Sequence, residues 1–345
     1  MRPGSAGHRL RVAPRPGHET EMTTAPPISR LAVIGAGLIG GSVARAAKAA
    51  GAANTVVVTD RSLEVRKRVR EIGRSFADEV AETSAGAVKD ADLVVVAVPV
   101  GACGPVAGEI AAALRPGAIL SDVGSVKASV AREMAPFVPD GVHFIPAHPV
   151  AGTENSGPDA GFAELFVNRW CILTPVEGTD PAATDALQAF WEKIGANVAV
   201  MTPGHHDLVL AITSHLPHLI AYTIVGTANE LGDVTESEVL KFSAGGFRDF
   251  TRIAASDPTM WRDVFLHNKE AVLEMLGTFN EDLSKLTRAI RRGDGEALFE
   301  HFSRTRAIRR GIVTIGQDSA APDFGRPHGP LPIAPIVRPY ASDDD

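Results

Sequence analysis

Short, continuously apolar runs dominate the chain between Leu31 and Met201, and alanine-rich stretches separate them. Most of these runs do not alternate with polar residues, which is typical of strands buried on both faces of a parallel sheet. Because helical crossovers lie between the runs, we predict an α/β domain with a Rossmann-type, doubly wound sheet. The expected strands are Leu31–Ile34, Thr55–Thr59, Leu93–Val98, Ala118–Asp122, Val142–Pro146, Trp170–Thr174 and Asn197–Met201.

The pattern after these strands is entirely helical. Thr202-Pro203 combines a helix N-cap with proline at the first helical position, and the helix that begins there runs towards Leu231. Pro217 lies inside this helix and predicts a kink. Asp257-Pro258 is a second helix start of the same kind.

An apolar stripe follows the second start. Its residues recur at spacings of three, four and seven, which indicates one long amphipathic helix. Such a stripe suits a helix–helix interface between subunits, and core packing within one subunit is an equal alternative. A last helix is expected over residues 296–312. The stripe consists of Phe265, Val272, Leu276, Phe279, Leu283, Leu286 and Ile290.

These changes divide the chain into four segments. Residues 1–28 and 316–345 are rich in proline and glycine and have no hydrophobic period, so we expect two disordered tails. Residues 29–201 form the expected Rossmann-type domain, and residues 202–315 form an all-helical domain. A chain of 345 residues has room for these two domains.

Composition narrows the class of protein. The net charge is -7, from 34 basic and 41 acidic residues, and an acidic chain argues against a nucleic-acid partner. The two cysteines, Cys103 and Cys171, form no disulfide framework, which fits a cytoplasmic protein. No apolar run approaches the roughly 18 residues that span a bilayer, so no membrane association is expected.

The glycine-rich segment that follows the first strand predicts a dinucleotide site. It reads Gly35-Ala36-Gly37-Leu38-Ile39-Gly40 and leads into an alanine-rich helix. Gly35 permits the tight turn, Gly37 lets the backbone approach a pyrophosphate, and Gly40 lets the helix lie against the strand. The N–H groups of the helix N-terminus then face the phosphates, with Leu38 and Ile39 among the contacting residues. A purely structural glycine turn is the alternative.

Asp60 ends the second expected strand, at the distance beyond the glycines where a carboxylate binds the ribose hydroxyls of the adenosine half. It would repel a 2′-phosphate, which favours NAD over NADP, although Arg61 beside it offers a charge for that phosphate. Val98 and Pro99 follow another strand and are expected to edge the nicotinamide pocket. A simple proline turn is the alternative there.

Polar clusters occupy the places where a ligand cleft is expected. They read DVGSVK at 122–127 and HPVAGTE at 148–154, each after a strand, then SHLPH at 214–218 and GGFRDFTRIA at 245–254 in the helical half. His215 and His218 share a helical face. Since no carboxylate or cysteine partner lies nearby in sequence, we expect no metal site.

Together, these segments resemble the prephenate dehydrogenase family, including its arogenate and cyclohexadienyl dehydrogenase members. The resemblance runs from Leu31 to Ile312 and keeps the family order of the motifs. It implies an active site between a Rossmann-type domain and a helical substrate and dimerisation domain, and therefore a homodimer. It also implies the reaction, in which NAD⁺ takes a hydride from the ring carbon that bears the hydroxyl and the ring carboxylate leaves as CO₂. The product is 4-hydroxyphenylpyruvate from prephenate, or tyrosine from arogenate.

The resemblance also gives the residues their roles. His148 would accept the proton of the ring hydroxyl, which suits a neutral imidazole. Ser125 would bind the same hydroxyl, orient His148 and border the cofactor. Arg252 would hold a substrate carboxylate with its planar fork. The remaining substrate-side residues would be Thr153, Glu154 (paired with Arg252), His215, His218 and Trp261, with Lys127, Arg248 and Asp249 either in the cleft or in ion pairs of its wall.

Two other kinds of protein are compatible with parts of this pattern. A hydroxyacid dehydrogenase or an imine reductase also joins a Rossmann domain to a helical one, and relies on a lysine there, for which Lys241 and Lys269 are available. A non-catalytic NAD sensor would keep the fold and lose His148 or Arg252. Both residues are present, which favours the enzyme.

Overall fold

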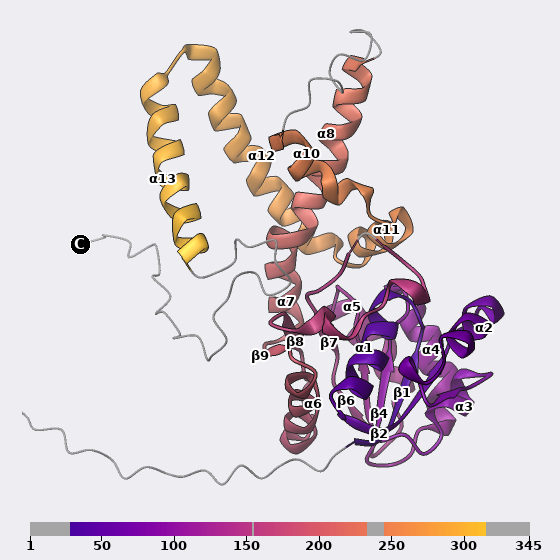
Figure 1. The fold of residues 1–345 in the computed structure, drawn as a ribbon. Helices are drawn as coiled ribbons and strands as arrows, with labels where there is room; N and C mark the ends of the chain where they lie inside the picture. Colours follow the sequence, from indigo (N-terminus) through magenta and orange to yellow (C-terminus); the bar gives the residue numbers. More distant parts are fainter. Residues whose placement is uncertain (1–27, 154, 233–244, 315–345) are drawn as a thin grey trace, which may run out of the picture.

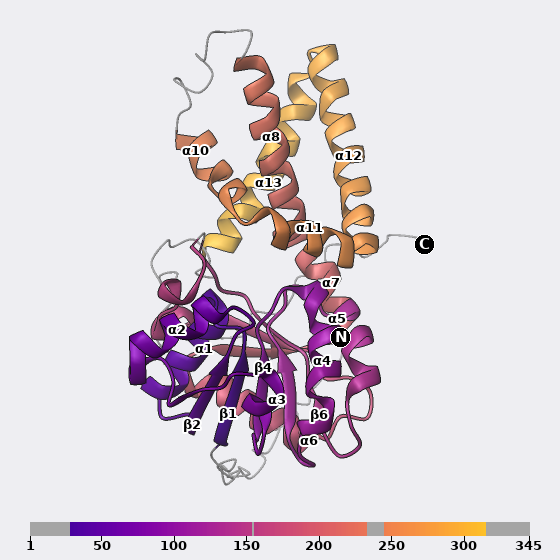
Figure 2. The same cartoon turned by 90° about the vertical axis from the view of Figure 1, so that its right-hand side faces the viewer.

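The computed structural model describes residues 28–153, 155–232 and 245–314 (Figure 1). Residues 1–27 and 316–345 of the two expected tails lie outside the described residues, as do Glu154 and Lys241. In the described part, an α/β body carries a helical part from which long helices project (Figures 1 and 2).

The main sheet has six parallel strands in the order β3-β2-β1-β4-β5-β6, so the predicted Rossmann-type fold is confirmed. From β1 the chain continues outward to β2 and β3, and from β4 it continues outward in the opposite direction to β5 and β6, so the switch point lies between β1 and β4. In such sheets, ligands bind in the crevice at the carboxyl ends of the strands beside the switch point. The sequence pattern missed β3, which is only two residues long. The strands are β1 (Ile28–Ile34), β2 (Ala53–Thr59), β3 (Glu79–Val80), β4 (Leu93–Val96), β5 (Ile119–Asp122) and β6 (His143–Phe144).

The strands predicted at 170–174 and 197–201 do not extend the parallel sheet. They form a second sheet together with β7, which the sequence pattern missed, in the order β7-β8-β9. Its strands are β7 (Ala147–Pro149), β8 (Trp170–Leu173) and β9 (Asn197–Val200). Only two residues separate β7 from β6, too few for the crossover that a parallel neighbour needs. Strand β7 instead leaves the main sheet and pairs antiparallel with β8, so that His148 lies opposite Ile172.

Helices cover both faces of the main sheet, which explains why its strands are continuously apolar. In β1, Leu31 and Val33 contribute to one buried cluster, and Ala32 and Ile34 contribute to the other. The first cluster lies under α1 (Leu38–Ala49), α2 (Leu63–Ile72) and α6 (Pro181–Lys193). The second lies under α3 (Ser84–Val88), α4 (Cys103–Ile110) and α5 (Ala128–Met134). Short 3₁₀ turns are η1 (Gly73–Ser75), η2 (Val100–Ala102), η3 (Ala111–Ala113), η4 (Ala135–Phe137), η5 (Pro158–Ala160) and η6 (Ala163–Phe166).

In the helical part, helices begin at both of the predicted positions. The Thr202 side chain accepts a hydrogen bond from the His205 N–H, and Asp257 accepts one from the Met260 N–H. The first helix consists of α7 (Pro203–Leu210), a π-helical turn η7 (Ala211–His215) and α8 (Leu216–Gly232). The π turn ends at His215, two residues before Pro217, where the kink was predicted. The later elements are α10 (Gly245–Thr251), η8 (Arg252–Ala255), α11 (Pro258–His267), α12 (Lys269–Arg292) and α13 (Gly295–Thr314).

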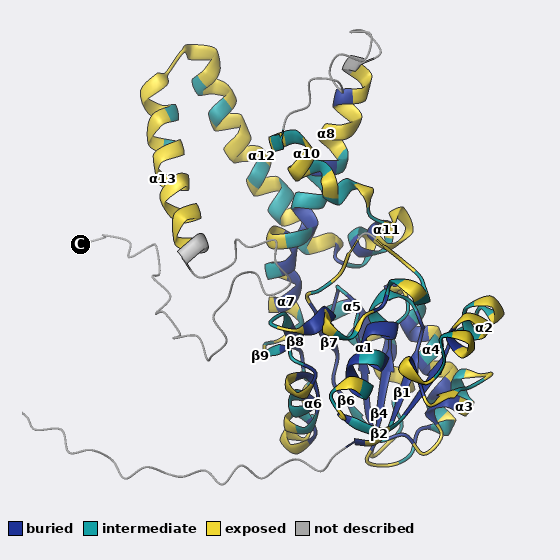
Figure 3. Cartoon of the chain, in the orientation of Figure 1, coloured by how far each residue is buried: buried dark blue, intermediate teal, exposed yellow. Residues whose placement is uncertain are grey.

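The predicted single helix with one apolar stripe is in fact two helices. The chain leaves helical geometry at Asn268, with φ -111° and ψ 33°, so Phe265 lies on α11 and the rest of the stripe lies on α12. Helices α12 and α13 form a hairpin that points away from the body, and most of its surface is exposed (Figure 3). Leu283 and Ile290 of the stripe are 49% and 66% exposed.

Among the described residues, one helical segment, Pro203–Glu230, is long and apolar enough to cross a membrane by length and composition. An 18-residue window within it has a mean hydropathy of 1.6 and is 28% buried. The segment contains no uninterrupted apolar run of that length, because polar residues divide it. Those interruptions include His206, Asp207 and His215, whose side chains are buried.

Candidate active site

The glycine turn between β1 and α1 has the shape of a pyrophosphate cradle. Gly35 has φ +98°, and a Cβ atom there would overlap the carbonyl oxygen of Ala97. A Cβ at Gly40 would overlap the carbonyl oxygen of Gly35, whereas a Cβ at Gly37 would meet nothing within 4 Å. Gly37 is also the N-cap of α1 and provides no side-chain cap, so the N–H groups of the first helical turn lack that partner. The residues therefore fit a bound dinucleotide.

Asp60 lies beside this turn, at the carboxyl end of β2. Its Oδ2 accepts a hydrogen bond from the Ala36 N–H at 2.9 Å, and its Oδ1 accepts one from the Ser62 N–H at 2.9 Å. Each carboxylate oxygen can accept a further bond, as ribose hydroxyls would require. Arg61 is exposed next to it. Pro99 is exposed at the end of β4, and the half-buried Val98 would contact a Cβ at Gly35, so both belong to the same crevice.

His148 is the centre of the polar cluster, on β7. The residue is 8% exposed, and its Nδ1 lies 2.8 Å from Nε2 of His206. His206 Nδ1 lies 2.8 Å from Oδ1 of Asp207. Burial lowers the pKa of His148 well below its usual value, and nearby His206, Lys127 and His215 lower it further. His148 is thus a neutral imidazole.

The turn after β5 is tied to the His148 strand by a buried ion pair. Lys127 has no exposed surface, forms a salt bridge with Asp122, and donates to the carbonyl oxygen of Ala147 at 2.8 Å. Asp122 in turn accepts the Ala147 N–H at 3.3 Å and the Gly124 N–H at 2.7 Å. Lys127 therefore supports the turn and does not reach into the cleft, while Ser125, in the same turn, is partly exposed.

His215 presents an unsatisfied donor. The Asn268 side-chain amide donates to the carbonyl oxygen of Asp207 at 2.9 Å, and its other N–H faces Nδ1 of His215 at 3.0 Å. Since His215 Nδ1 must accept there, its Nε2 carries the proton. That Nε2 and the indole Nε1 of Trp261 are buried and find no hydrogen-bond partner among the described residues. Burial lowers the pKa of His215 to about 4, so it stays a neutral donor. Two such donors fit a ligand with acceptor oxygens.

Trp261 contacts both of the predicted substrate histidines, His215 and His218. Its ring stacks on His218 with 3.6 Å between centroids and meets His215 edge-on at 6.0 Å. The His218 Nδ1–H donates to the carbonyl oxygen of Ser214 at 2.8 Å, which leaves Nε2 for a ligand. Burial lowers the pKa of His218, and the charge of Arg252 adds to this effect, so Arg252 on η8 is within electrostatic reach.

Other residues singled out from the sequence are not brought into this cluster. Thr153 is exposed, and its hydroxyl accepts a hydrogen bond from the Asn155 N–H at 3.3 Å. Arg248 and Asp249 form an exposed ion pair with each other, and Lys269 is exposed at the start of α12. Within the described ranges, no group of three or more metal-ligating side chains is placed to hold a metal ion.

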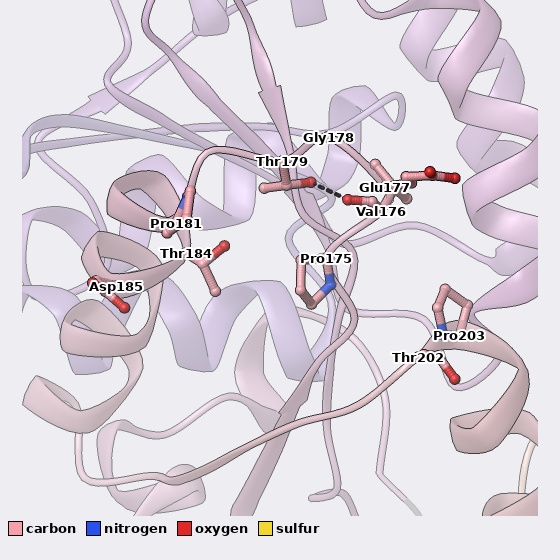
Figure 4. A pocket seen from close by; sticks show the side chains of 10 residues that line it. All are labelled: Pro175, Val176, Glu177, Gly178, Thr179, Pro181, Thr184, Asp185, Thr202 and Pro203. Carbon is pink, nitrogen blue, oxygen red and sulfur yellow. Dashed lines mark hydrogen bonds between the residues drawn. The ribbon is translucent and has the colours of Figure 1, made fainter.

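A separate hollow of about 630 Å³ lies between the β8–α6 connection and the start of α7 (Figure 4). The ionisable side chains in its lining are Glu177 and Asp185, so it would repel an anionic ligand. None of the candidate site residues lines it. The lining consists of Pro175, Val176, Glu177, Gly178, Thr179, Pro181, Thr184, Asp185, Thr202 and Pro203.

His206, Asp207 and Asn268 are the residues that sequence reasoning missed. His206 and Asp207 follow the Thr202-Pro203 start near the beginning of α7, and the side chains of all three missed residues are buried. A weak signal existed for Asn268, since it stands between Phe265 and Val272 at the spacing of the apolar stripe.

Comparison with known protein families gives two adjoining matches. The model described as "Prephenate dehydrogenase, nucleotide-binding domain" matches residues 43–200. The model described as "Prephenate dehydrogenase, dimerization domain" matches residues 202–304. The boundary between the matches falls between β9 and α7.

Individual proteins give the same result. The chain is 45% identical to the cyclohexadienyl dehydrogenase of Zymomonas mobilis, over 82% of this chain and 96% of that protein. It is 34% identical to the prephenate dehydrogenase of Bacillus subtilis, over 84% and 77% of the two chains. A solved structure of Aquifex aeolicus prephenate dehydrogenase, in complex with hydroxyphenyl propionate and NAD⁺, is similar with a TM-score of 0.76 at 32% identity, over 83% and 98% of the chains.

Proposed function

This chain belongs to the prephenate dehydrogenase family, and from that premise we propose that His148 is the proton acceptor of its reaction. The chain is an NAD-dependent oxidoreductase that oxidises and decarboxylates prephenate to 4-hydroxyphenylpyruvate, or arogenate to tyrosine. The observation that carries the assignment is the buried, neutral imidazole beside the turns that follow β5 and β7.

His148 acts on the hydroxyl of the substrate ring. NAD⁺, when bound on the turn at Gly37, supplies the acceptor for the hydride from the carbon that bears this hydroxyl. His148 Nε2 takes the hydroxyl proton as the carbon is oxidised. When the bond to the ring carboxylate breaks, its electron pair completes the aromatic ring and CO₂ leaves. His148 can then return the proton to the ring oxygen, so the step needs no other acid.

The substrate carboxylates and ring oxygens are held from the helical side. Arg252 supplies a permanent positive charge, and His218 lies within its electrostatic reach. His215 Nε2 and Trp261 Nε1 supply the two buried donors that lack partners among the described residues. A neutral histidine donor discriminates by geometry, since a ligand without a matching acceptor leaves it unsatisfied. We assign Ser125 to the ring hydroxyl and to the border of the cofactor.

The direct test is NADH formation by the purified protein with prephenate and with arogenate, each measured with NAD⁺ and with NADP⁺. We expect turnover with NAD⁺ and at least one of the two substrates. An inactive but folded protein that still binds NAD⁺ would support the alternative of a cofactor sensor and would contradict the proposal. The ratio of kcat/KM for the two substrates assigns the preference.

Replacing Asp60 with serine is expected to shift the cofactor preference towards NADP⁺. The change removes a negative charge beside the ribose and a charged hydrogen-bond acceptor worth about 1.5–3 kcal/mol. We therefore expect kcat/KM for NAD⁺ to fall roughly 10- to 150-fold, with a smaller change for NADP⁺. Steady-state kinetics with both cofactors measure this. A wild-type preference for NADP⁺ would instead make Arg61 the deciding residue, and an Arg61→Ala variant is the matched control.

A homodimer would cover the apolar surface of the helical hairpin. Side chains on α12 and α13 are between 49% and 72% exposed in the single chain, namely Leu273, Leu283, Ile290, Phe299, Phe302 and Ile308. Isolated exposed apolar residues are ordinary, but a long apolar hairpin is typical of an interface. The family match to a dimerization domain covers α12 and the first half of α13.

Light scattering at micromolar concentration is expected to give twice the chain mass. Ile290→Glu should weaken the dimer, because each of the two protomers loses the burial of an isoleucine, about 1.5–3 kcal/mol per protomer and roughly a 10²- to 10⁴-fold increase in Kd in all. Phe137→Glu, a matched change at a residue 44% exposed on the other domain, should leave the mass unchanged. A monomeric wild type would contradict the proposal.

We also propose residues 29–201 and 202–315 as the limits of the two domains, and the cytoplasm as the location. Cys103 and Cys171 are both buried and unpaired, and burial raises the pKa of both thiols. Unpaired thiols are typical of a reducing compartment.

A further inference from the structure

The hydrogen bonds behind His148 continue through two more side chains, and nothing in the proposed mechanism uses these. His148 Nδ1 faces His206 Nε2, and His206 Nδ1 faces Asp207 Oδ1, each at 2.8 Å. We propose that His206 and Asp207 are positioning residues that hold His148 in the tautomer whose Nε2 accepts a proton. This inference rests on the proposed role of His148 as the base.

The Asp207 carboxylate fixes the direction of the whole chain of bonds. Its Oδ1 accepts the Lys127 N–H at 2.7 Å, and its Oδ2 accepts the Ala128 N–H at 2.9 Å, both at the start of α5. These contacts hold the carboxylate as an acceptor, because a backbone N–H can only donate. The His206 nitrogen that faces the carboxylate must therefore carry a proton.

The next two steps follow from the chemistry of imidazole. A neutral His206 with its proton on Nδ1 has a lone pair on Nε2, and this lone pair faces His148. His148 must then carry its own proton on Nδ1 and donate it to His206. The remaining nitrogen, His148 Nε2, has the lone pair that a general base needs.

A doubly protonated His206 would give the opposite arrangement, since it would donate to His148 and leave the proton on His148 Nε2. Two observations oppose this state. His206 has no exposed surface, and burial without full charge compensation disfavours an imidazolium. Burial indeed lowers the pKa of His206, although Asp207 opposes the shift.

The chain of bonds also joins the two domains. His148 lies on β7 of the Rossmann-type domain, whereas His206 and Asp207 lie on α7 of the helical domain. Asp207 is held from both sides, by the α5 N–H groups through its carboxylate and by Asn268 through its carbonyl oxygen. The orientation of the base is thus set by the contact between the domains, close to the expected substrate cleft.

Kinetics of His206 variants test the proposal. In His206→Leu the acceptor for His148 is lost, so kcat should fall at least about tenfold and no further than the roughly 10²- to 10⁴-fold expected for losing the base itself. KM should change little. His206→Gln offers an amide oxygen in a similar place and should recover part of kcat. His205→Leu removes the exposed neighbouring histidine on the same helix and should behave as wild type. A wild-type kcat for His206→Leu would overturn the proposal.

A double-mutant cycle separates positioning from a general structural role. If His206 acts only through His148, then His206→Leu should cause no further loss of kcat in a His148→Asn background. Independent, multiplicative losses would overturn the proposal. Full activity of His148→Asn alone would instead refute the base assignment under the proposed function, so the two failures are distinguishable.

The tautomer itself can be observed by NMR with ¹⁵N-labelled histidine in the full-length protein. We expect His148 to carry its proton on Nδ1 in the wild type and to lose this preference in His206→Leu. A wild-type His148 protonated on Nε2 would overturn the proposal even if the variants proved too unstable for kinetics.

Discussion

His148→Asn is expected to lower kcat by roughly 10²- to 10⁴-fold, the usual contribution of a positioned general base. Asparagine keeps a polar side chain of similar reach but cannot take up a proton at neutral pH. The loss should appear in kcat because the proton moves in the transition state. KM should change little, since a hydrogen bond to the ring hydroxyl can survive.

The control for this variant is His205→Asn, which makes the same replacement at an exposed histidine. Circular dichroism and the affinity for NAD⁺ should be unchanged in both variants, because neither residue is part of the glycine turn. A His148→Asn enzyme with normal kcat and a raised KM would show that His148 binds the substrate and that another group is the base.

Structural features that depend only on short, contiguous stretches of sequence were predictable. The strand before Gly35, the glycine turn and the helix after it form one continuous segment, and steric and hydrogen-bonding rules act within it. The helix starts at Thr202 and Asp257 are local in the same way. The structure confirms each of these elements close to its predicted position.

Features that depend on contacts between distant segments were not predictable in this way. The sequence pattern identifies β8 and β9 as strands, but their pairing with β7 depends on how the chain turns after β6. For Lys127 the sequence left open both a position in the cleft and an ion pair of its wall, and only the fold shows the buried ion pair with Asp122 and the bond to Ala147.

The largest omission within the site has the same origin. His206 and Asp207 are 58 and 59 positions after His148, so no local spacing links them to the base. A histidine near a helix start is ordinarily a surface residue or a cap, and these two are recognised only because α7 lies against β7 and α5. The family resemblance gives His148 and Arg252 their proposed roles, but it does not show what orients them.

Arg252→Gln is expected to act mainly on KM. The arginine holds a substrate carboxylate in the ground state as well as in the transition state, and uniform binding of this kind affects KM and leaves kcat largely unchanged. Losing a charged hydrogen-bonding partner costs about 1.5–3 kcal/mol, which corresponds to roughly a 10- to 150-fold rise in KM.

Two further variants make the Arg252 result specific. Arg74→Gln removes the same charge from an exposed arginine of the other domain and should leave KM unchanged, which excludes an effect of net charge. Arg252→Lys keeps the charge but loses the planar fork, so its KM should lie between those of the wild type and Arg252→Gln. If kcat collapses in Arg252→Gln while His148→Asn raises only KM, then the two roles are reversed. The guanidinium would then stabilise the charge that develops during decarboxylation, and a group other than His148 would accept the proton of the ring hydroxyl.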